Sequence, residues 1–362
     1  MPKAAKYLLI GSTEPNSGKS ATVLGLAHQL QQRGVKIAYS KPLGTCWDEA
    51  LLQDQEADVQ FISETLELPD EQVLPVILAL KEAAIQRRVQ GEDITDYQQL
   101  LLQSTQIQDV DLVLLEGPAN LEEGTLFDIS LPQIAECLDA PVLLVARFHS
   151  LLIVGALLSA KKRLGHRLLG VVINDIPESR IQEVKETVQP FLEQHHIPIL
   201  GLLPGNALLR SVAVSELVKL LNAEVLCRPD RLDLMVESLS IGAMNVSSAL
   251  KYFRKGCNMA VVTGGDRADI QLAALETSTQ CLILTGHMPP SQAVISRAED
   301  LEIPILSVDL DTLTTVEIVD HAFGHVRVHE SIKVQCMYQL METHFDTDRL
   351  LADLQLEPAV TP

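Results

Sequence analysis

The sequence has few aromatic residues and few cations. Aromatic side chains make up 4% of its 362 residues, with a single Trp, so the core must be built mainly from aliphatic side chains. Its 28 Lys and Arg residues are outnumbered by 48 Asp and Glu residues, which gives a formal net charge of −20. A surface of this sign repels phosphate backbones and anionic lipid headgroups. We therefore expect neither a nucleic-acid partner nor a membrane partner.

Cysteine motifs and long apolar runs are also missing. The six cysteines include no C-x-x-C pair, so the pattern indicates neither a zinc site nor a disulfide framework and fits a reducing cytoplasm. The apolar run at residues 7–10 is too short for a signal peptide. The most apolar later stretch, residues 151–160, has about half of the roughly 20 residues needed to span a bilayer. The expected location is the cytoplasm.

Short aliphatic runs alternate with longer stretches of helical period along the first 205 residues. Such runs predict strands buried on both faces, as in a parallel sheet covered by helices. The first run is followed by apolar residues at helical spacing and then by Gly34, a helix stop. The predicted strands are residues 7–10, 37–39, 112–115, 142–146, 169–173 and 199–203.

A second, shorter α/β series follows a boundary near residue 208. Pro204 and Gly205 close the sixth strand, and we expect an amphipathic helix with Ser211 or Ser215 as its N-cap. Three more strands are predicted at residues 259–263, 281–285 and 303–308. The expected organisation is a first domain at residues 1–207, a second at residues 208–330 and a helical tail at residues 331–362.

The most specific signal is the loop between the first strand and the first helix, where residues 11–20 read GSTEPNSGKS. A bound triphosphate needs backbone N–H groups at a helix N-terminus, a lysine at its β and γ oxygens and a hydroxyl on Mg²⁺, and Lys19 and Ser20 fit the last two roles. The match to G-x-x-x-x-G-K-[ST] is imperfect, because Thr13 stands at the first glycine position. The alternatives are a polar turn without a ligand and an ancestral loop that no longer turns over ATP.

These residues resemble dethiobiotin synthetase-like ATPases. Residues 12–20 line up without a gap on the G-T-x-T-x-x-G-K-T loop of that family, and residues 40–42 resemble its K-P element. The pair Glu116-Gly117 resembles the acidic residue and glycine after the third main strand, and residues 170–174 resemble the strand that ends in an adenine-side Asn. The order and spacing agree over about the first 205 residues.

In the second half, residues 261–270 read VVTGGDRADI and look like the signature of a DRTGG domain. The pairing of the two domains resembles the N-terminal regulatory half of long-form phosphate acetyltransferases and standalone relatives of that half. The resemblance implies an α/β fold, with a P-loop NTPase-type parallel sheet, helices on both faces and a smaller α/β DRTGG domain after it. Long-form enzymes carry a further acetyltransferase domain and this sequence ends at Pro362, so we do not expect acetyl transfer.

The resemblance implies ATP and Mg²⁺ as cofactors and carries over a set of site residues. The catalytic candidates are Lys19 and Lys41, the nucleotide-binding candidates are Thr13, Asn16, Ser17, Gly18, Lys19, Ser20 and Asn174, and the metal-binding candidates are Ser20, Glu116 and Asp58.

Each candidate also has a plainer interpretation. Lys41 fits a solvated strand end, Glu116 a surface or capping carboxylate, and Asp58 a carboxylate on a helix face. Asn174 also suits the turn that follows it. A structural turn is the interpretation that residues 263–267 favour, with Asp266 able to cap the next helix, and a regulatory ligand site is the alternative.

We therefore expect an ATP- and Mg²⁺-binding regulatory protein that senses a nucleotide or metabolite, with a possible small-molecule effector at the DRTGG domain, and that acts through a homo-oligomer or a partner. One alternative is an ATP-dependent ligase or kinase of a small carboxylate or amine. Another is a scaffold with a vestigial phosphate loop. Because Glu122 and Glu123 make the loop after Glu116 acidic, it suits an anionic carbamate poorly and we do not expect biotin synthesis.

Overall fold

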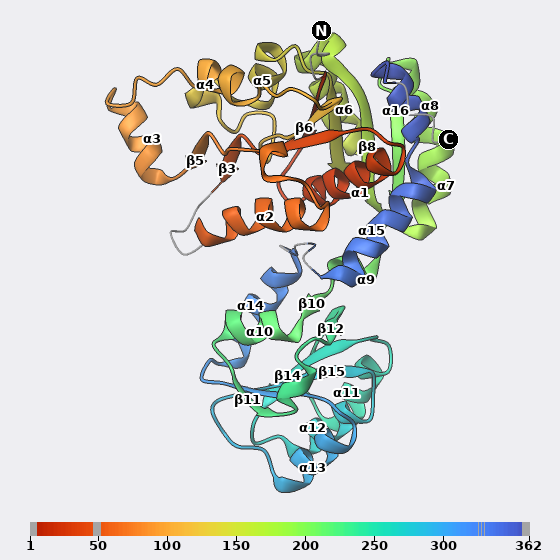
Figure 1. Cartoon of the computed structure of the whole chain (residues 1–362). Coiled ribbons are helices and arrows are strands. Elements are labelled where there is room, and N and C mark those ends of the chain that lie inside the picture. The colour runs from red at the N-terminus through yellow and green to blue at the C-terminus, as the bar shows by residue number, and fades with distance from the viewer. Residues whose placement is uncertain (1–5, 46–51, 325, 327, 329, 357–362) are drawn as a thin grey trace. The chain divides into compact units, whose positions relative to one another are not determined.

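The computed structural model describes residues 6–45, 52–324, 326, 328 and 330–356 (Figure 1). The chain divides into two compact units, one made of Met1–Gly205 with Val328–Pro362 and the other of Asn206–Arg327. Each unit is an α/β domain with its own hydrophobic core. The predicted fold class is confirmed.

The first unit is built on a seven-stranded sheet in the order β4-β2-β6-β1-β7-β8-β9, and every neighbouring pair is parallel. Its strands are β1 (Lys6–Ser12), β2 (Ile37–Ser40), β4 (Val73–Leu74), β6 (Leu112–Glu116), β7 (Val142–Arg147), β8 (Leu168–Ile176) and β9 (Ile199–Pro204). All six predicted strands are confirmed, and the two-residue edge strand β4 is an addition. The register pairs Ile10 with Glu116 and Ser40 with Leu115, so β1, β2 and β6 end side by side.

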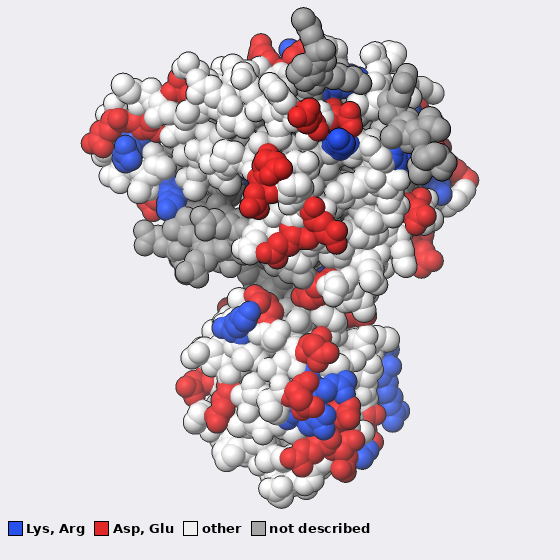
Figure 2. All heavy atoms as spheres, viewed as in Figure 1, with Lys and Arg blue, Asp and Glu red and all other residues white. Residues whose placement is uncertain are grey.

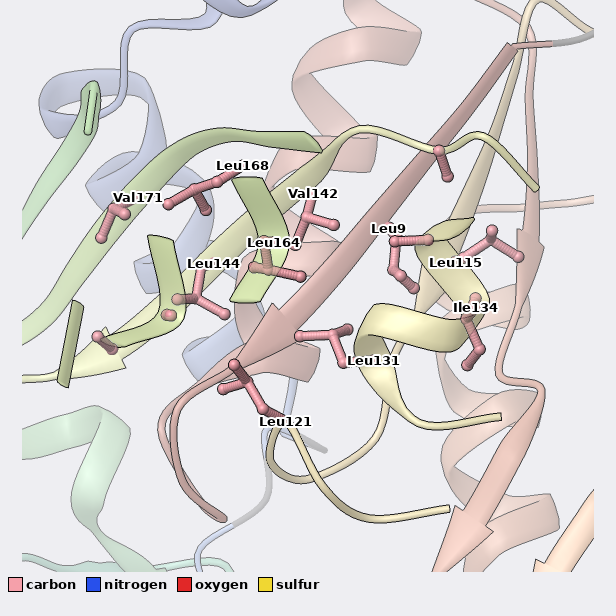
Figure 3. Close-up of a cluster of buried hydrophobic side chains, with 14 of the residues drawn as sticks. Leu9, Leu115, Leu121, Leu131, Ile134, Val142, Leu144, Leu164, Leu168 and Val171 are labelled. Atoms are coloured by element: carbon pink, nitrogen blue, oxygen red, sulfur yellow. The ribbon is translucent and has the colours of Figure 1, made fainter. Parts of the chain in front are cut away.

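Helices cover both faces of this sheet. On one face, α4, α5 and α6 close an aliphatic core over residues such as Leu9, Leu115 and Leu144 (Figure 3). On the other face, α1 contacts β1 and β6 and packs against α15. The helices are α1 (Lys19–Gln32), α2 (Leu52–Thr65), α3 (Glu82–Val89), α4 (Tyr97–Ser104), α5 (Leu131–Cys137), α6 (Ile153–Leu164), α7 (Ile181–Glu183), α8 (Gln189–Gln194), α15 (Ser331–His344) and α16 (Thr347–Asp353). A separate pair of short strands, β3 (Leu43–Thr45) and β5 (Leu78–Leu80), is parallel.

The C-terminal helices belong to the first unit. Gly25 of α1 lies so close to α15 that a Cβ there would come within 2.5 Å of Met341 Cγ. The N–H of Asp346 donates to the carbonyl of Leu200 in β9 at 2.7 Å, and Lys6 Nζ donates to the carbonyl of Gln355 at 2.8 Å. These helices therefore complete one face of the first domain.

The second unit has a five-stranded sheet in the order β11-β16-β15-β14-β13, with β13 to β16 parallel and β11 antiparallel at the edge. Helices α11, α12 and α13 cover one face, and α10 and α14 cover the other. The strands are β11 (Glu224–Cys227), β13 (Ser238–Ile241), β14 (Met259–Gly264), β15 (Thr279–Thr285) and β16 (Ile305–Val308), with β10 (Val212–Ala213) paired to β12 (Met235–Val236). The helices are α9 (Ala207–Arg210), α10 (Val214–Leu221), α11 (Val246–Phe253), α12 (Ala268–Leu275), α13 (Gln292–Asp300) and α14 (Thr312–Gly324).

One expected helix start is wrong. Helix α10 begins at Val214 with Ala213 as its N-cap, because residues 212 and 213 first form a short strand. The hydroxyl of Ser211 donates instead to the carbonyl of Leu208 at 2.6 Å. The helix ends at Leu221 because Asn222 adopts a left-handed conformation with φ 46°, which frees the following residues to form β11.

Charge on the second unit is mixed locally despite the negative total, and Figure 2 shows Lys and Arg side chains interleaved with acidic ones there. Arg228, for example, contacts both Asp230, at 2.6 Å, and Glu302, at 3.7 Å. Within the described part of the chain, no helix combines the length and the hydropathy required to cross a membrane.

Candidate functional site

The loop from Thr13 to Gly18 leads from β1 into α1 and presents an open helix N-terminus. Gly18 is the N-cap in a left-handed conformation with φ 91°, no side chain caps the helix, and the first turn carries no acidic residue. Asn16 is also left-handed, with φ 54°. The first N–H groups of a helix have no intrahelical acceptor and carry partial positive charge. The loop therefore has the features of an anion seat.

Asn174, near the end of β8, holds this loop from the side. Its Nδ2 donates to the carbonyl oxygen of Ser17 at 2.9 Å. The φ of Gly18 favours glycine, and a Cβ there would lie 2.2 Å from the same Nδ2, so a side chain at this position would have to displace the Asn174 amide. The hydroxyl of Ser17 is buried and has no hydrogen-bond partner. A buried hydroxyl without a partner beside an open helix end is a group that a bound ligand would satisfy.

The carboxylate of Glu116 is the centre of the site, at the end of β6 and only 1% exposed. Its Oε1 accepts a hydrogen bond from Ser20 Oγ at 2.8 Å and lies 3.8 Å from Lys19 Nζ and 3.5 Å from Lys41 Nζ. Its Oε2 accepts from the hydroxyl of Tyr39 at 2.9 Å. The structure thus gathers a hydroxyl and two ammonium groups on one oxygen.

Asp58 joins the cluster from α2. Its Oδ2 lies 3.6 Å from Lys41 Nζ, so Lys41 bridges two carboxylates. Of the predicted residues, Lys19, Ser20, Lys41, Glu116 and Asp58 therefore meet in one cluster, and Gly18 and Asn174 border it.

Burial and charge act in opposite directions on the pKa values of this cluster. Burial lowers the pKa of Lys19 more than the charge of Glu116 raises it. Burial also disfavours the charged form of Lys41, but Glu116 and Asp58 outweigh it and raise the pKa of Lys41. Burial would raise the pKa of Glu116, yet Lys41 and Lys19 together with the Ser20 and Tyr39 donors lower it. Glu116 is therefore held as a carboxylate.

The donor set fits a hard divalent cation. Ser20 and Glu116 place a hydroxyl oxygen and a carboxylate oxygen 2.8 Å apart, and Mg²⁺ takes such oxygen ligands. In the part of the chain that the structure describes, no group of three or more His, Cys, Asp and Glu side chains surrounds a common point. Mg²⁺ usually binds one or two protein oxygens and takes the rest from phosphate and water. These residues therefore fit a metal that arrives with a nucleotide.

Three residues near the site were not predicted. Tyr39 lies two residues before Lys41, and that spacing on an extended chain puts both side chains on one face, so the strand alternation was a usable signal. Glu14 of the loop pairs with His149 at 2.7 Å, and because the two residues are 135 positions apart, no local sequence pattern predicts this contact. Thr13, which was predicted, uses its N–H to bond the carbonyl of Val145 at 3.3 Å.

The glycine loop of the second unit, residues 263–267, is filled by neighbouring residues of the same domain. A Cβ on Gly265 would lie 2.2 Å from the carbonyl oxygen of Met288. Gln271 Nε2 donates to the carbonyls of Gly264 and Gly265 at 2.8 and 3.0 Å. The expectation that Asp266 caps the helix is wrong, because α12 begins at Ala268 with Arg267 as an N-cap that makes no side-chain cap bond.

Comparisons with known proteins bear on both units. A family model described as an AAA domain matches residues 6–213, and one described as a DRTGG domain matches residues 216–322. The chain is 27% identical to a phosphate acetyltransferase of Nitratidesulfovibrio vulgaris, over 95% of this chain and 51% of that protein. It is 26% identical to the one of Synechocystis sp., with the same coverage. The chain therefore spans about half the length of these curated relatives.

Two solved structures have low similarity to the chain. The CBS and DRTGG domains of the regulatory region of Clostridium perfringens pyrophosphatase, complexed with the activator diadenosine tetraphosphate, are 20% identical with a TM-score of 0.29, over 44% of this chain and 76% of that chain. The receptor FtsY of Elizabethkingia anophelis with GDP is 16% identical with a TM-score of 0.35, over 57% and 58%. Scores this low carry no functional inference. The family models confirm both predicted domain types, and the similar curated proteins confirm the relation to phosphate acetyltransferases.

Proposed function

The chain belongs to the AAA-domain family and carries a DRTGG domain after the AAA domain, and from this premise we propose that it binds ATP with Mg²⁺ and acts as a regulatory protein related to phosphate acetyltransferases. The nucleotide would occupy the loop at residues 13–18, and the second domain would respond to a nucleotide or metabolite. The protein would act in the cytoplasm, which agrees with the free state of the five described cysteines.

The observation that carries this proposal is the convergence on Glu116 Oε1. Lys19, Lys41 and Ser20 are the groups that a metal-bound triphosphate requires, and all three face one carboxylate oxygen beneath the open end of α1. Phosphate oxygens would take the ammonium groups, and Ser20 and Glu116 would hold Mg²⁺ with help from Asp58. The metal supplies charge neutralisation between the carboxylate and the phosphates. Asn174 remains the predicted adenine contact.

This arrangement makes ATP binding depend on Mg²⁺. Without the metal, ATP must draw Lys19 and Lys41 away from Glu116 and leave that buried carboxylate facing the phosphates. Repulsion between buried like charges is weakly screened, so the metal-free complex is disfavoured.

Calorimetry with ATP in Mg²⁺ and in EDTA tests the proposal on wild type and Glu116→Gln. We expect wild type to bind ATP much more tightly with Mg²⁺ than in EDTA, and the variant to bind ATP in EDTA more tightly than wild type does while losing the Mg²⁺ effect. Glu136→Gln, an exposed carboxylate on α5, is the matched control and should behave like wild type. Absence of ATP binding to wild type under both conditions contradicts the proposal.

A specific feature also favours an enzyme as second candidate. Lys41 lies beside Lys19 on the same oxygen and is held by Asp58, so two cations could stabilise a γ-phosphoryl group during transfer. An ATP-dependent ligase or kinase predicts ADP release that depends on a small carboxylate or amine. Tight ATP binding without turnover in a broad substrate screen favours the regulatory function instead.

Helix α6 supports the proposed homo-oligomer. It is preceded by Leu152, which is 86% exposed, and its exposed side carries Gly155 and Ala156, small residues that permit close approach of another helix. If copies of the chain associate through this face, Leu152→Asp should convert the oligomer to monomer in light scattering. The control is Ile94→Asp, an equally exposed residue on the α3–α4 connection. A monomeric wild type contradicts the proposal.

A further inference from the structure

Tyr39 is a fully buried tyrosine in a sheet of aliphatic strands. It lies in β2 next to Leu114 of β6, with no exposed surface. A buried phenol needs a hydrogen-bond partner, and the partner here is Oε2 of Glu116 at 2.9 Å. Burial and the charge of Glu116 raise the pKa of Tyr39 well above its usual value, so the phenol stays a donor.

The two oxygens of Glu116 are therefore used differently. Oε2 is tied to Tyr39 inside the sheet, whereas Oε1 receives Ser20 and faces Lys19 and Lys41. We propose that Tyr39 is a positioning residue of the Mg²⁺ site, because its hydroxyl fixes the Glu116 carboxylate so that Oε1 is the oxygen offered to the metal. This inference rests on the proposed function.

A physical reason makes such an anchor necessary. The terminal torsion of a glutamate side chain is broad, so a free carboxylate could turn and present both oxygens to the two lysines. Tyr39 removes that freedom with one hydrogen bond and leaves the metal-facing oxygen to Ser20. Partners of this kind behind a metal ligand change metal affinity by roughly 10- to 100-fold when they are removed.

The test is Tyr39→Phe, which keeps the ring and removes only the hydroxyl. ATP binding is measured by calorimetry over a range of Mg²⁺ concentrations and again in EDTA. We expect the Mg²⁺ concentration at half effect to rise roughly 10- to 100-fold, with ATP affinity in EDTA little changed. If Tyr39 only fills space, the melting temperature changes and the Mg²⁺ dependence does not, which would overturn the inference.

The matched control is Tyr97→Phe. Tyr97 is a buried tyrosine of the same domain whose hydroxyl donates to Asp93 Oδ2 at 2.8 Å. Its loss should leave the Mg²⁺ dependence of ATP binding unchanged. An equal shift in both variants overturns the assignment to Tyr39.

The outcomes separate this inference from the proposed function. A wild type that shows no Mg²⁺-dependent ATP binding contradicts both, whereas a normal wild type with an unshifted Tyr39→Phe contradicts the role of Tyr39 alone. Should Tyr39→Phe fail to fold, fluorotyrosine at position 39 keeps the ring and hydroxyl and makes the phenol a stronger donor. It should then lower the Mg²⁺ concentration at half effect, and an unchanged value would overturn the inference.

Discussion

Two loops in this chain, residues 13–18 and 263–267, connect a buried parallel strand to a helix through glycine. They differ in whether their polar groups have hydrogen-bond partners within the protein. In the first loop, the N-terminus of α1 has no side-chain cap and the hydroxyl of Ser17 is buried without a partner. In the second, Gln271 donates to the carbonyls of Gly264 and Gly265, and Met288 packs against Gly265. The first loop is open to an anion and the second is filled by the protein itself.

This comparison shows that glycine can occupy similar strand-to-helix turns for different structural reasons. Gly18 is favoured by its left-handed φ, and a side chain there would displace the Asn174 amide that bonds to the loop. Gly265 is required because the backbone of Met288 occupies the space of a side chain. We therefore expect changes in the first loop to alter ATP binding and changes in the second to alter stability.

Lys19→Ala should have the largest effect on the first loop. Hydrogen bonds to a charged group contribute about 1.5–3 kcal/mol, so ATP affinity in Mg²⁺ should fall by roughly 10- to 150-fold in calorimetry. Lys185→Ala removes an exposed lysine of the same domain and should leave the affinity unchanged. Equal affinities for Lys19→Ala and wild type would mean that the loop is not the ATP site.

Gly265→Ala should destabilise the second unit without changing ATP binding. Overpacking of a filled site costs about 1–3 kcal/mol, which urea unfolding would detect. Gly18→Ala is the counterpart and should weaken ATP binding, because its Cβ would displace Asn174. If Gly265→Ala is the variant that weakens ATP binding, the division of roles between the loops is wrong.

Asn174→Ala should have a moderate effect, because it removes one hydrogen bond to the first loop. A neutral hydrogen bond contributes about 0.5–1.5 kcal/mol, so ATP affinity should fall by roughly 2- to 12-fold. Asn258→Ala removes an amide that donates to Glu237 in the second unit, and ATP affinity should not respond. A larger loss in the Asn258 variant would contradict the account.

The smallest expected effect is on the pH dependence of stability and comes from Asp93, a carboxylate of the first unit that belongs to neither loop. Hydrogen bonds from Thr95 and Tyr97 lower the pKa of Asp93 from 3.8 to about 2. Because the pKa in the folded state is the lower one, the stabilisation is present above about 3.8 and is lost as pH falls toward 2. Asp93→Asn should flatten the pH dependence of urea unfolding over this range, and an unchanged slope would contradict the assignment.

Much of the fold was predictable because its strands are local aliphatic runs buried on both faces. The phosphate loop was predictable because its signal is also local: Gly18, Lys19 and Ser20 are consecutive residues. The position of the C-terminal helices was not predictable from the sequence. Helix α15 packs against α1 through residues such as Gly25 and Met341, which are more than 300 positions apart. No local pattern records such a contact.

The candidate site was predictable in its charges and not in its hydrogen bonds. Lys41, Glu116 and Asp58 were identified from resemblance, and the structure places them in one cluster. For Tyr39 the sequence predicts only a position in a buried strand, which an aromatic residue suits without any hydrogen-bond partner. The partner that makes it functionally informative is 77 residues away in sequence.

The most direct test of the central claim is an amide NMR spectrum recorded while ATP and Mg²⁺ are added. We predict saturable shifts of the backbone N–H signals of residues 16–20, which form the open end of α1. The signals of residues 264–267 should not be the first to shift. Unchanged signals at residues 16–20, at ATP concentrations that saturate any binding detected by calorimetry, would contradict the account.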